Sequence, residues 1–416
     1  MAEWIEKSLG EIAEVTKLAG FEFTKYIKYI DNGEIIALRA LNLRNGELDL
    51  SDIKRISRKV SEGLTRSKIY KDDILLTYTG NGYGDCAIIE ENDKYHLAPN
   101  ICKIIPNQNV IYPYYLYCYI RSKAFYNQMS NNMTGSGQPT IPMKTIRLLK
   151  IPVPDMSVQV KIANIIRSLN QKIRNNKVIN NNLLEQIKAI CTAWLSEYKP
   201  FDGIMPSDWV ETPLSDMAEF ISGYSYKGTE LTDSTIAMPT IKNFDRKGGF
   251  KLDGYKEIIP PSKLKESQHA ELFDTLVAHT DLTQNAEVIG NAEPVMSKSG
   301  YDDIVFSMDL VKVLPKKDGV SKFLIAAILQ DKKFKAHCLG YVNGTTVLHL
   351  SKKALPEYKL FLPSDFSTLK PLDEVVTALY KQVSSNISEN TYLEELRESL
   401  LPKLMSGELD VSDIEI

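Results

Sequence analysis

The sequence predicts an α+β protein with two tandem globular domains of mixed α/β structure, separated by two long helices that form an antiparallel coiled coil. Two observations predict this pseudo-twofold internal repeat. The halves of the 416-residue chain repeat each other at a period of about 205 residues. Each repeat also ends in a long heptad pattern. The predicted boundaries are 1–154 for the first domain, 155–200 for the first helix, 201–363 for the second domain, and 364–416 for the second helix and C-terminal tail.

The repeat consists of short segments that keep their order in both halves of the chain. W-I-E-K-S-L-G-E-I-A-E-V beginning at Trp4, for example, corresponds to W-V-E-T-P-L-S-D-M-A-E-F beginning at Trp209. The other pairs are 70–79 with 271–280, the glycine-containing loops 135–141 with 343–350, and the proline-terminated strands 149–154 with 358–363. Their constant order and near-constant offset are hard to explain by chance.

Within the first globular domain, short β-prone runs alternate with turn signals, as in small sheets. The runs are 35–41, 74–79 and 87–90, and Asn-Gly turn signals stand at 32–33 and 45–46. Apolar residues on one face predict a helix over Pro113–Met129, and its counterpart in the second domain is Lys322–Cys338.

The two long helices are predicted from apolar residues that recur in alternating steps of four and three. The second seam is the first one shifted by 210 positions, and both carry a pair of Asn residues near their middle. One heptad pattern alone would also fit a single helix on a domain surface. Buried Asn residues fix register and partner, so the matching Asn pairs favour packing of the two helices on each other. The predicted interface residues are Ile162, Ile166, Leu169, Ile173, Asn176, Asn180 and Leu183 in the first helix and Leu372, Val376, Leu379, Val383, Asn386, Asn390 and Leu393 in the second.

Only Arg397 breaks the second seam, and Leu396 beside it is expected to take its place.

Composition and motifs argue against several classes of protein. No apolar run approaches the roughly 20 residues that span a membrane, and the five cysteines are scattered, which fits a cytoplasmic protein without disulfides or a zinc site. The histidines lack metal-binding spacing, and neither a P-loop nor a glycine-rich cofactor turn is found. P-E-Y-K (356–359) lacks the upstream Asp of a nuclease. We therefore predict no catalytic residues and no metal site.

Several segments resemble the specificity subunits of type I restriction-modification enzymes. They are P-x-x-W-x-x-x-x-L-x-D-x-A (Pro206–Ala218), R-A-L-N-L-R-N-G-E-L-D-L-S-D-I-K-R-I-S (Arg39–Ser57), K-I-Y-K-D-D-I-L-L-T-Y-T-G (Lys68–Gly80) and L-L-P-K-L-M-S-G-E-L (Leu400–Leu409). The resemblance covers essentially the whole chain. It implies two target-recognition domains, each reading one half of a split site in double-stranded DNA, and paired helices that set the gap.

The resemblance also implies partners. Two methyltransferase subunits would dock on the helices, and restriction subunits would join in the full complex. S-adenosylmethionine, ATP and Mg²⁺ would bind the partner subunits only. The acidic segment 364–416, with 11 Asp and Glu against 4 Lys and Arg, is expected to face a protein. The alternative is a coiled-coil scaffold that brings partners together without reading DNA.

A DNA reader needs cations for phosphates and polar side chains for base edges. The candidates in the first domain are Arg39, Asn42, Arg44, Lys54, Arg55, Arg58, Lys59, Arg66 and Lys68, with Tyr78, Thr79, Asn81, Ser136 and Gln138 on two loops. In the second domain they are Lys242, Asn243, Arg246, Lys247, Lys263, Lys265, His279, Thr280, Asn343 and Thr345. Asn42 and Arg44 are expected to share one face of a strand, and Asn42 aligns with Asn243.

Two alternatives stay open for these candidates. The cations could form a solvated charged surface, and the loops could be hairpin turns without a partner. The second domain has A-H-T-D-L-T (278–283) where the first has T-Y-T-G-N-G (77–82), so close approach of its backbone to DNA is less expected.

Overall fold

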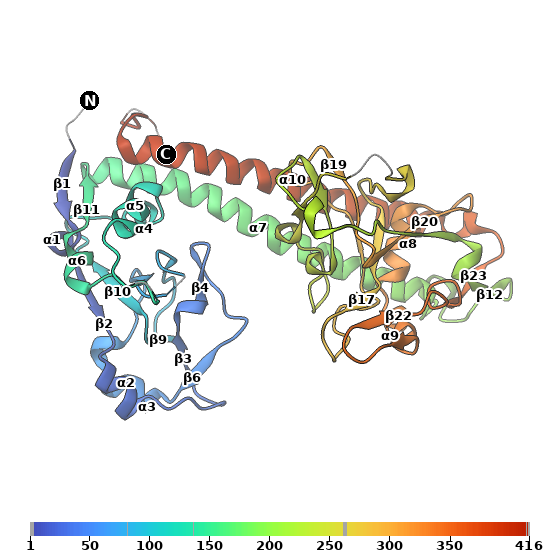
Figure 1. Cartoon of the computed structure of the whole chain (residues 1–416), viewed down its shortest axis with the longest axis horizontal. Coiled ribbons are helices and arrows are strands. Elements are labelled where there is room, and N and C mark those ends of the chain that lie inside the picture. The colour runs from blue at the N-terminus through green and yellow to red at the C-terminus, as the bar shows by residue number, and fades with distance from the viewer. Residues whose placement is uncertain (1–3, 81, 136, 261–263, 413, 415–416) are drawn as a thin grey trace. The chain divides into compact units, whose positions relative to one another are not determined.

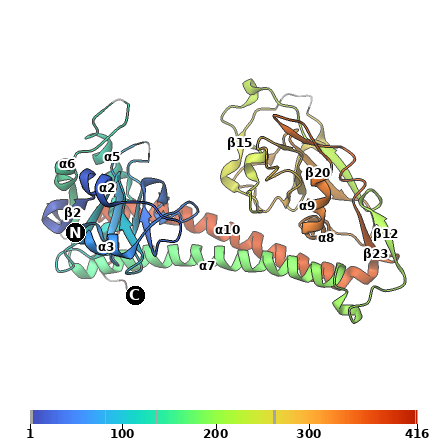
Figure 2. The same ribbon diagram turned by 90° about the horizontal axis from the view of Figure 1, so that it is seen from below.

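The computed structural model describes residues 4–80, 82–135, 137–260, 264–412 and 414. The chain forms two compact units, the first from Met1–Lys172 with Leu393–Ile416 and the second from Ile173–Tyr392 (Figure 1). Each unit contains one globular part and a segment of both long helices. Within each unit the two helical segments lie side by side, as a second view also shows (Figure 2).

The globular part of the first unit is built from small sheets and short helices. Its elements are β1 (Ile5–Ser8), α1 (Leu9–Ile12), β2 (Ala13–Lys17), α2 (Gly20–Tyr26), β3 (Ile35–Leu38), β4 (Leu43–Arg44), β5 (Glu47–Leu48), β6 (Lys54–Ile56), α3 (Arg58–Gly63), β7 (Ile74–Thr77), β8 (Cys86–Ile88), β9 (Tyr95–Leu97), β10 (Ile101–Pro106), α4 (Pro113–Ile120), α5 (Lys123–Ser130), α6 (Met143–Leu148) and β11 (Lys150–Val153). The strand orders are β1-β11, β2-β10-β7-β8, β6-β3-β9 and β4-β5. Helix α7 (Met156–Leu195) follows.

The second unit repeats this plan. Its elements are β12 (Trp209–Pro213), β13 (Ala218–Ser222), β14 (Ile236–Met238), β15 (Lys256–Glu257), β16 (Thr275–Ala278), β17 (Thr280–Asp281), β18 (Ala292–Pro294), β19 (Asp303–Ile304), β20 (Leu310–Pro315), α8 (Lys322–Leu329), α9 (Lys332–Leu339), β21 (Val342–Asn343), β22 (Leu348–Leu350), β23 (Lys359–Pro363) and α10 (Lys370–Ser406). The orders β12-β23, β13-β20-β16-β18 and β15-β14-β19 match those of the first unit, and β17-β22-β21 is an added sheet. The predicted α+β fold and internal repeat are confirmed.

The two four-stranded sheets repeat the same buried ion pair. Asp73, just before β7, lies 3.7 Å from the ammonium group of Lys103 on β10. Asp274, just before β16, lies 3.6 Å from that of Lys312 on β20. A buried charge is tolerated only when it is paired, so the shared pair marks a framework common to both units.

The helix predicted over Pro113–Met129 is wrong in one respect, because the structure has two helices there. Helix α4 ends at Ile120, and the Ser122 hydroxyl accepts a hydrogen bond from the backbone N–H of Phe125 at the start of α5. The counterpart is split in the same way, with the Asp331 carboxylate accepting from the N–H of Lys333. Residues that cap a new helix end the previous one.

The second unit shows how the two long helices pair. The Asn176 Nδ2 donates to Asn390 Oδ1 at 2.9 Å, and the Asn386 Nδ2 donates to Asn180 Oδ1 at 2.7 Å. The partner's number falls as the number on α7 rises, so the helices run antiparallel, as predicted. All four amides are buried.

In the first unit, Ile162 and Ile166 of α7 pack in one core with residues of α10 such as Leu404. Leu396 and Arg397 are both half-buried. The Arg397 guanidinium keeps the position and donates to Asn170 Oδ1 of α7 at 2.9 Å.

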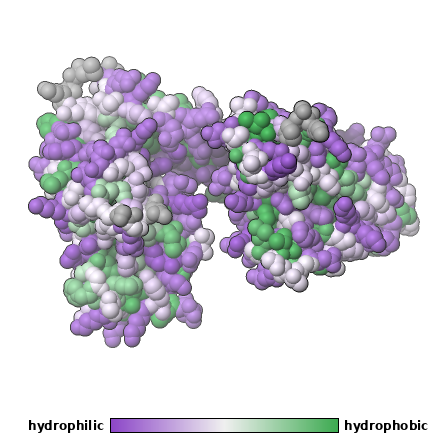
Figure 3. All heavy atoms as spheres, viewed as in Figure 1, coloured by the Kyte–Doolittle hydropathy of each residue, from purple (hydrophilic) through white to green (hydrophobic). Residues whose placement is uncertain are grey.

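All five cysteines are buried and free. No helix among the described residues is long and apolar enough to cross a bilayer, and the described part of the chain holds no cluster of three His, Cys, Asp or Glu side chains arranged for a metal. Hydrophilic residues predominate on the face shown in Figure 3.

Candidate nucleic-acid interface

Three loops of the first unit converge, and we call them its loop cluster: the β4–β5 turn, the β7–β8 loop and the α5–α6 loop. The Gly80 N–H donates to the Pro139 carbonyl at 2.9 Å, and the Thr140 hydroxyl donates to Thr79 Oγ1 at 3.3 Å, which joins the β7–β8 and α5–α6 loops. The backbone N–H of Asn45, in the turn, bonds the Asp85 carboxylate. Burial nevertheless raises the pKa of Asp85.

The β4–β5 turn is held from α4. Asn45 and Gly46 have φ angles of 54° and 85°, the backbone expected for an Asn-Gly hairpin turn. The Tyr117 hydroxyl donates to the Gly46 carbonyl at 2.6 Å, and the Arg121 guanidinium donates to the Asn45 carbonyl at 3.2 Å. Arg44, which is exposed, therefore projects from a fixed turn.

The second unit has a corresponding loop cluster, made of the turn after the 3-10 helix Ile241–Asn243, the β17–β18 loop and the β21–β22 turn. The Gln284 side chain donates to the Thr345 carbonyl at 2.7 Å, and the Asn291 side chain donates to the Asp245 carbonyl at 3.1 Å. The Arg246 guanidinium lies 3.1 Å from the Glu287 carboxylate. Each unit thus presents the same three-loop arrangement.

The structure brings several of the predicted residues together in these clusters. The loop cluster of the first unit contains Thr79 and Gln138, with Arg44 directly before its β4–β5 turn. The loop cluster of the second unit contains Arg246, Lys247 and Thr345, with His279 directly before β17, Thr280 on β17 and Asn343 at the end of β21. Arg44, Gln138, Arg246, Lys247, Asn343 and Thr345 are exposed. The candidates Asn81, Ser136 and Lys263 lie outside the described residues.

Asn42 and Asn243 are not available to read bases, so this prediction is wrong. Both are fully buried and end 3-10 turns rather than lying on a strand. The Asn42 amide accepts from the Arg39 N–H at 3.0 Å and donates to the Asp49 and Asp52 carbonyls, each at 2.8 Å.

Asn243 makes the equivalent bonds, accepting from the Thr240 N–H at 2.9 Å and donating to the Lys251 carbonyl at 2.8 Å. The alignment of the two Asn residues therefore reflects a shared turn. Arg39 belongs to the same local structure, because its guanidinium contacts the carbonyl and the carboxylate of Asp52 at 2.8 and 3.2 Å.

A second group of predicted residues lies on β6 and α3, and we call Lys54, Arg55, Arg58 and Lys59 the β6–α3 cations. Three of them are exposed, whereas the half-buried Arg55 donates to the Gly33 carbonyl at 3.2 Å. For this group a solvated charged surface and a phosphate-binding surface both stay open. Lys242 and Lys265 are exposed in the second unit.

Arg66 and Lys68 have structural partners. The exposed Arg66 donates to Thr16 Oγ1 on β2 at 2.8 Å, and the ammonium group of Lys68 lies 3.0 Å from the Asp93 carboxylate.

Three other candidates are more buried than a DNA contact requires. Tyr78 is 8% exposed, and Thr280, at 6%, donates to Asp309 Oδ1 at 3.1 Å. Burial lowers the pKa of His279, because it disfavours the charged imidazole. These side chains shape the loops from within.

Sequence reasoning missed residues that organise the β17–β18 loop, where little glycine is present. One oxygen of the buried Asp281 carboxylate accepts from the Thr283 N–H and the other from the Val288 N–H, both at 2.7 Å. These bonds lower the pKa of Asp281 despite its burial. The aspartate in A-H-T-D-L-T is the sequence signal for this ordered loop, because Asp carboxylates often accept hydrogen bonds from the backbone of their own loop.

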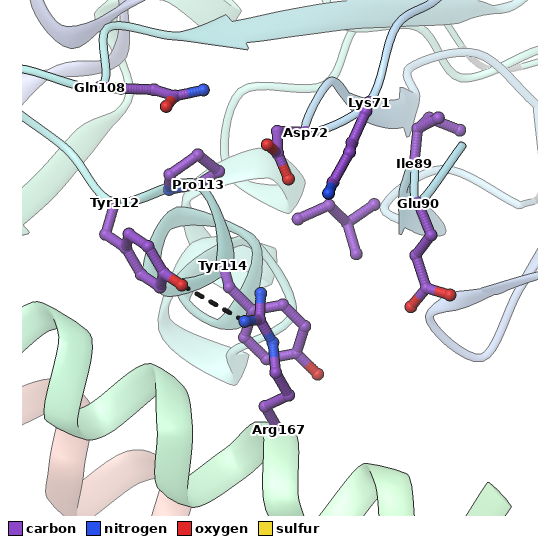
Figure 4. Close-up of a pocket in the computed structure, with 10 residues that line it drawn as sticks. Lys71, Asp72, Ile89, Glu90, Gln108, Tyr112, Pro113, Tyr114 and Arg167 are labelled. Atoms are coloured by element: carbon purple, nitrogen blue, oxygen red, sulfur yellow. Dashed lines mark hydrogen bonds between the residues drawn. The ribbon is translucent and has the colours of Figure 1, made fainter. Parts of the chain in front are cut away.

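A cavity of about 380 Å³ lies in the first unit beside α7. Arg167 of α7 lies over the ring of Tyr114, 4.3 Å from its centroid, and donates to the Tyr112 hydroxyl at 3.3 Å (Figure 4). In the second unit the residues that correspond to Asp72 and Tyr114 are Phe273 and Phe323, whose ring centroids lie 4.7 Å apart. The two units therefore pack this position differently.

The fold and the loops define a class: duplicated α+β proteins that carry one loop cluster in each repeat and an antiparallel pair of long helices. Residues 1–186 match the model of the "Type I restriction modification DNA specificity domain" family. This part of the chain is similar to such a domain, which confirms the resemblance found in the sequence.

Similarity to specificity subunits extends over nearly the whole chain. The chain is 23% identical, over 98% of its length, to the whole of the type I restriction enzyme HindI specificity subunit of Haemophilus influenzae. It is 22% identical, over 99% of its length, to 95% of the MjaIX specificity subunit of Methanocaldococcus jannaschii. The crystal structure of the S subunit of a type I restriction-modification system from M. genitalium shares the fold, with a TM-score of 0.56, 16% identity, and coverage of 97% of this chain and 96% of that one.

Proposed function

We propose that this chain is the DNA-specificity subunit of a type I restriction-modification complex and that it reads a bipartite site in double-stranded DNA. The observation that carries the proposal is the loop cluster, which occurs once in each unit on the same sheet framework. Two related readers in one chain suit two half-sites. The similarity to proteins named specificity subunits supports this function.

Exposed polar side chains on braced loops supply the chemistry for direct readout. Arginine matches the acceptor pair of guanine, and amides match adenine. Arg44 and Gln138 in the first unit and Arg246 and Asn343 in the second are such side chains, and all four are exposed. Exposed cations such as Lys54, Lys59 and Lys247 would contact phosphates and position the protein without reading sequence.

The helix pair would set the gap between half-sites and dock two methyltransferase subunits, with restriction subunits added in the full complex. S-adenosylmethionine, ATP and Mg²⁺ would bind those partners, so the chain itself would not be catalytic and would act in the cytoplasm. The competing proposal is a helical scaffold that assembles partners without DNA readout. The exposed loop side chains favour the DNA reader, because scaffolding does not need them.

The test is to coexpress the chain with its methyltransferase subunit and to map methylated adenines in the cell. Substituting Arg44 and Gln138 with Ala should relax one half-site only, and the same change at Arg246 and Asn343 should relax the other. Lys199→Ala, an exposed lysine between α7 and β12, is the control. Partner assembly without binding to any duplex would favour the scaffold instead.

A further inference from the structure

Resting on the proposed function, we propose that Tyr126 and Lys335 are positioning residues, each fixing the specificity of one half-site without contacting DNA. The two residues are equivalent, since each is the fourth residue of its helix, α5 or α9. The side chain of Tyr126 reaches the β7–β8 loop, and that of Lys335 reaches the β17–β18 loop. The two units perform this bracing with different chemistry.

In the first unit, the brace of the β7–β8 loop is an aromatic stack. The rings of Tyr126 and Tyr83 lie nearly parallel, at 17°, with centroids 5.3 Å apart. The Tyr126 hydroxyl donates to the Tyr83 hydroxyl at 2.7 Å, and the Tyr83 hydroxyl bonds Ser130 at 3.1 Å. This loop residue is thus tied to two successive turns of α5.

Gly84 completes the contact. Its φ is +89°, and a Cβ built there would lie 3.0 Å from the ring of Tyr126. The loop backbone therefore lies directly against the ring, which only glycine allows. The Gly84 N–H donates to the Thr77 carbonyl at 2.9 Å and the Thr77 N–H donates to the Asp85 carbonyl at 2.8 Å, so the base of the loop is closed as well.

In the second unit, the brace of the β17–β18 loop is a single ammonium group. The Lys335 Nζ bonds the carbonyls of Ala286, at 3.3 Å, Glu287, at 3.1 Å, and Ile289, and the Asn291 side-chain oxygen at 2.8 Å. This cation binds backbone carbonyls within residues 286–289, while the Asp281 carboxylate binds the backbone N–H groups of Thr283 and Val288 in the same loop.

The brace in the second unit extends to a candidate DNA contact. Glu287, whose carbonyl binds Lys335, holds the Arg246 guanidinium through its carboxylate. Asn291, whose side-chain oxygen binds Lys335, donates through its amide nitrogen to the Asp245 carbonyl. Loss of the Lys335 ammonium would therefore release both the loop and the turn that carries Arg246.

These side chains add little to the cores of their units. Helix α5 is anchored by the fully buried Phe125 and Met129, and α9 by Phe334 and Cys338. Tyr126 is 43% exposed, and Lys335 is half-buried. Truncation at either position should thus change the loop while the unit stays folded.

The experiment uses the full chain in complex with its methyltransferase subunit and reads the methylated motif. Tyr126→Ala should reduce discrimination against a single mismatched base pair in the first half-site by about tenfold and leave the second half-site unchanged. Lys335→Met should do the reverse. Tyr126→Phe, which keeps the stack, and Lys335→Arg, which keeps the cation, should restore most of the discrimination. Lys123→Ala and Lys332→Met are the matched controls on α5 and α9.

Hydrogen exchange of the loop amides should rise in the truncated variants, with the thermal midpoint of each unit kept. If Tyr126→Ala fails to fold, Gly84→Ala tests the same contact, because its new Cβ pushes the loop off the intact ring. A uniform loss of affinity, or changes in both half-sites, would overturn the positioning role. If the wild-type complex methylates no bipartite site, the proposed function itself fails.

Discussion

Asn180→Leu tests how the paired helices hold their register. In the native seam, the Asn386 amide donates to Asn180 Oδ1 at 2.7 Å, and both residues are at most 8% exposed. Leucine removes the acceptor and leaves a buried N–H group without its partner, which costs about 1–3 kcal/mol. Replacing both residues by Leu removes the unsatisfied group and should recover that cost, because an apolar layer suits a helix seam.

The second unit spans residues 173–392, a size for which 1 kcal/mol shifts the melting temperature by about 2–4 °C. We therefore expect Asn180→Leu to lower the midpoint of the second unit by about 4–8 °C, taking a cost of about 2 kcal/mol. Calorimetry on the full chain measures this shift, and Val178→Leu, outside the seam at a side chain that is 59% exposed, serves as the control. A single variant as stable as the wild type, or a double variant less stable than the single one, would refute the reasoning.

Three further predictions concern other parts of the chain. Replacing the β6–α3 cations with Ala should weaken duplex binding regardless of sequence and flatten the dependence of affinity on salt, measured by titration at several salt concentrations. Burial raises the pKa of Glu293 from 4.5 to about 7. The protonated carboxyl therefore contributes fully to the free energy of unfolding below pH 4.5, and this contribution is lost as pH rises through 7. Glu293→Gln should remove this pH dependence from melting temperatures measured across the range. One heptad inserted directly after Asn180 and one directly before Asn386 keep both Asn pairs and add about 10 Å to each helix. Mapped methylation sites should then show the same half-sites separated by about three more base pairs, at about 3.4 Å each.

The parts of the fold that could be predicted are those specified by local periodicity. A heptad seam is a property of consecutive residues, and Asn pairs at equivalent places have one symmetric way to meet. The break between α4 and α5 was also readable, since Ser122 is a favourable capping residue. It was missed because the apolar face continues across the break.

The side chains of the loop clusters could not be assigned from sequence, because their partners are distant in the chain. An Asn amide has the same donors and acceptors whether it reads adenine or closes a turn, and Asn42 closes a turn with Asp49 and Asp52. Lys335 looks like any surface lysine on an amphipathic helix. Only the fold shows that the carbonyls of the β17–β18 loop surround its ammonium group.

The two units share the framework of their four-stranded sheets but differ in the contacts that hold their loops. The ion pairs Asp73–Lys103 and Asp274–Lys312 occupy the same place in both four-stranded sheets, so the sheet framework is the same. The loops next to these sheets differ, because an aromatic stack holds the β7–β8 loop and a lysine ammonium group holds the β17–β18 loop. Because each brace contacts its own loop and not the shared ion pair, a brace and its loop can change together without disturbing the sheet. Under the proposed function, one unit could therefore acquire a new half-site while the other unit and the helix pair stay as they are.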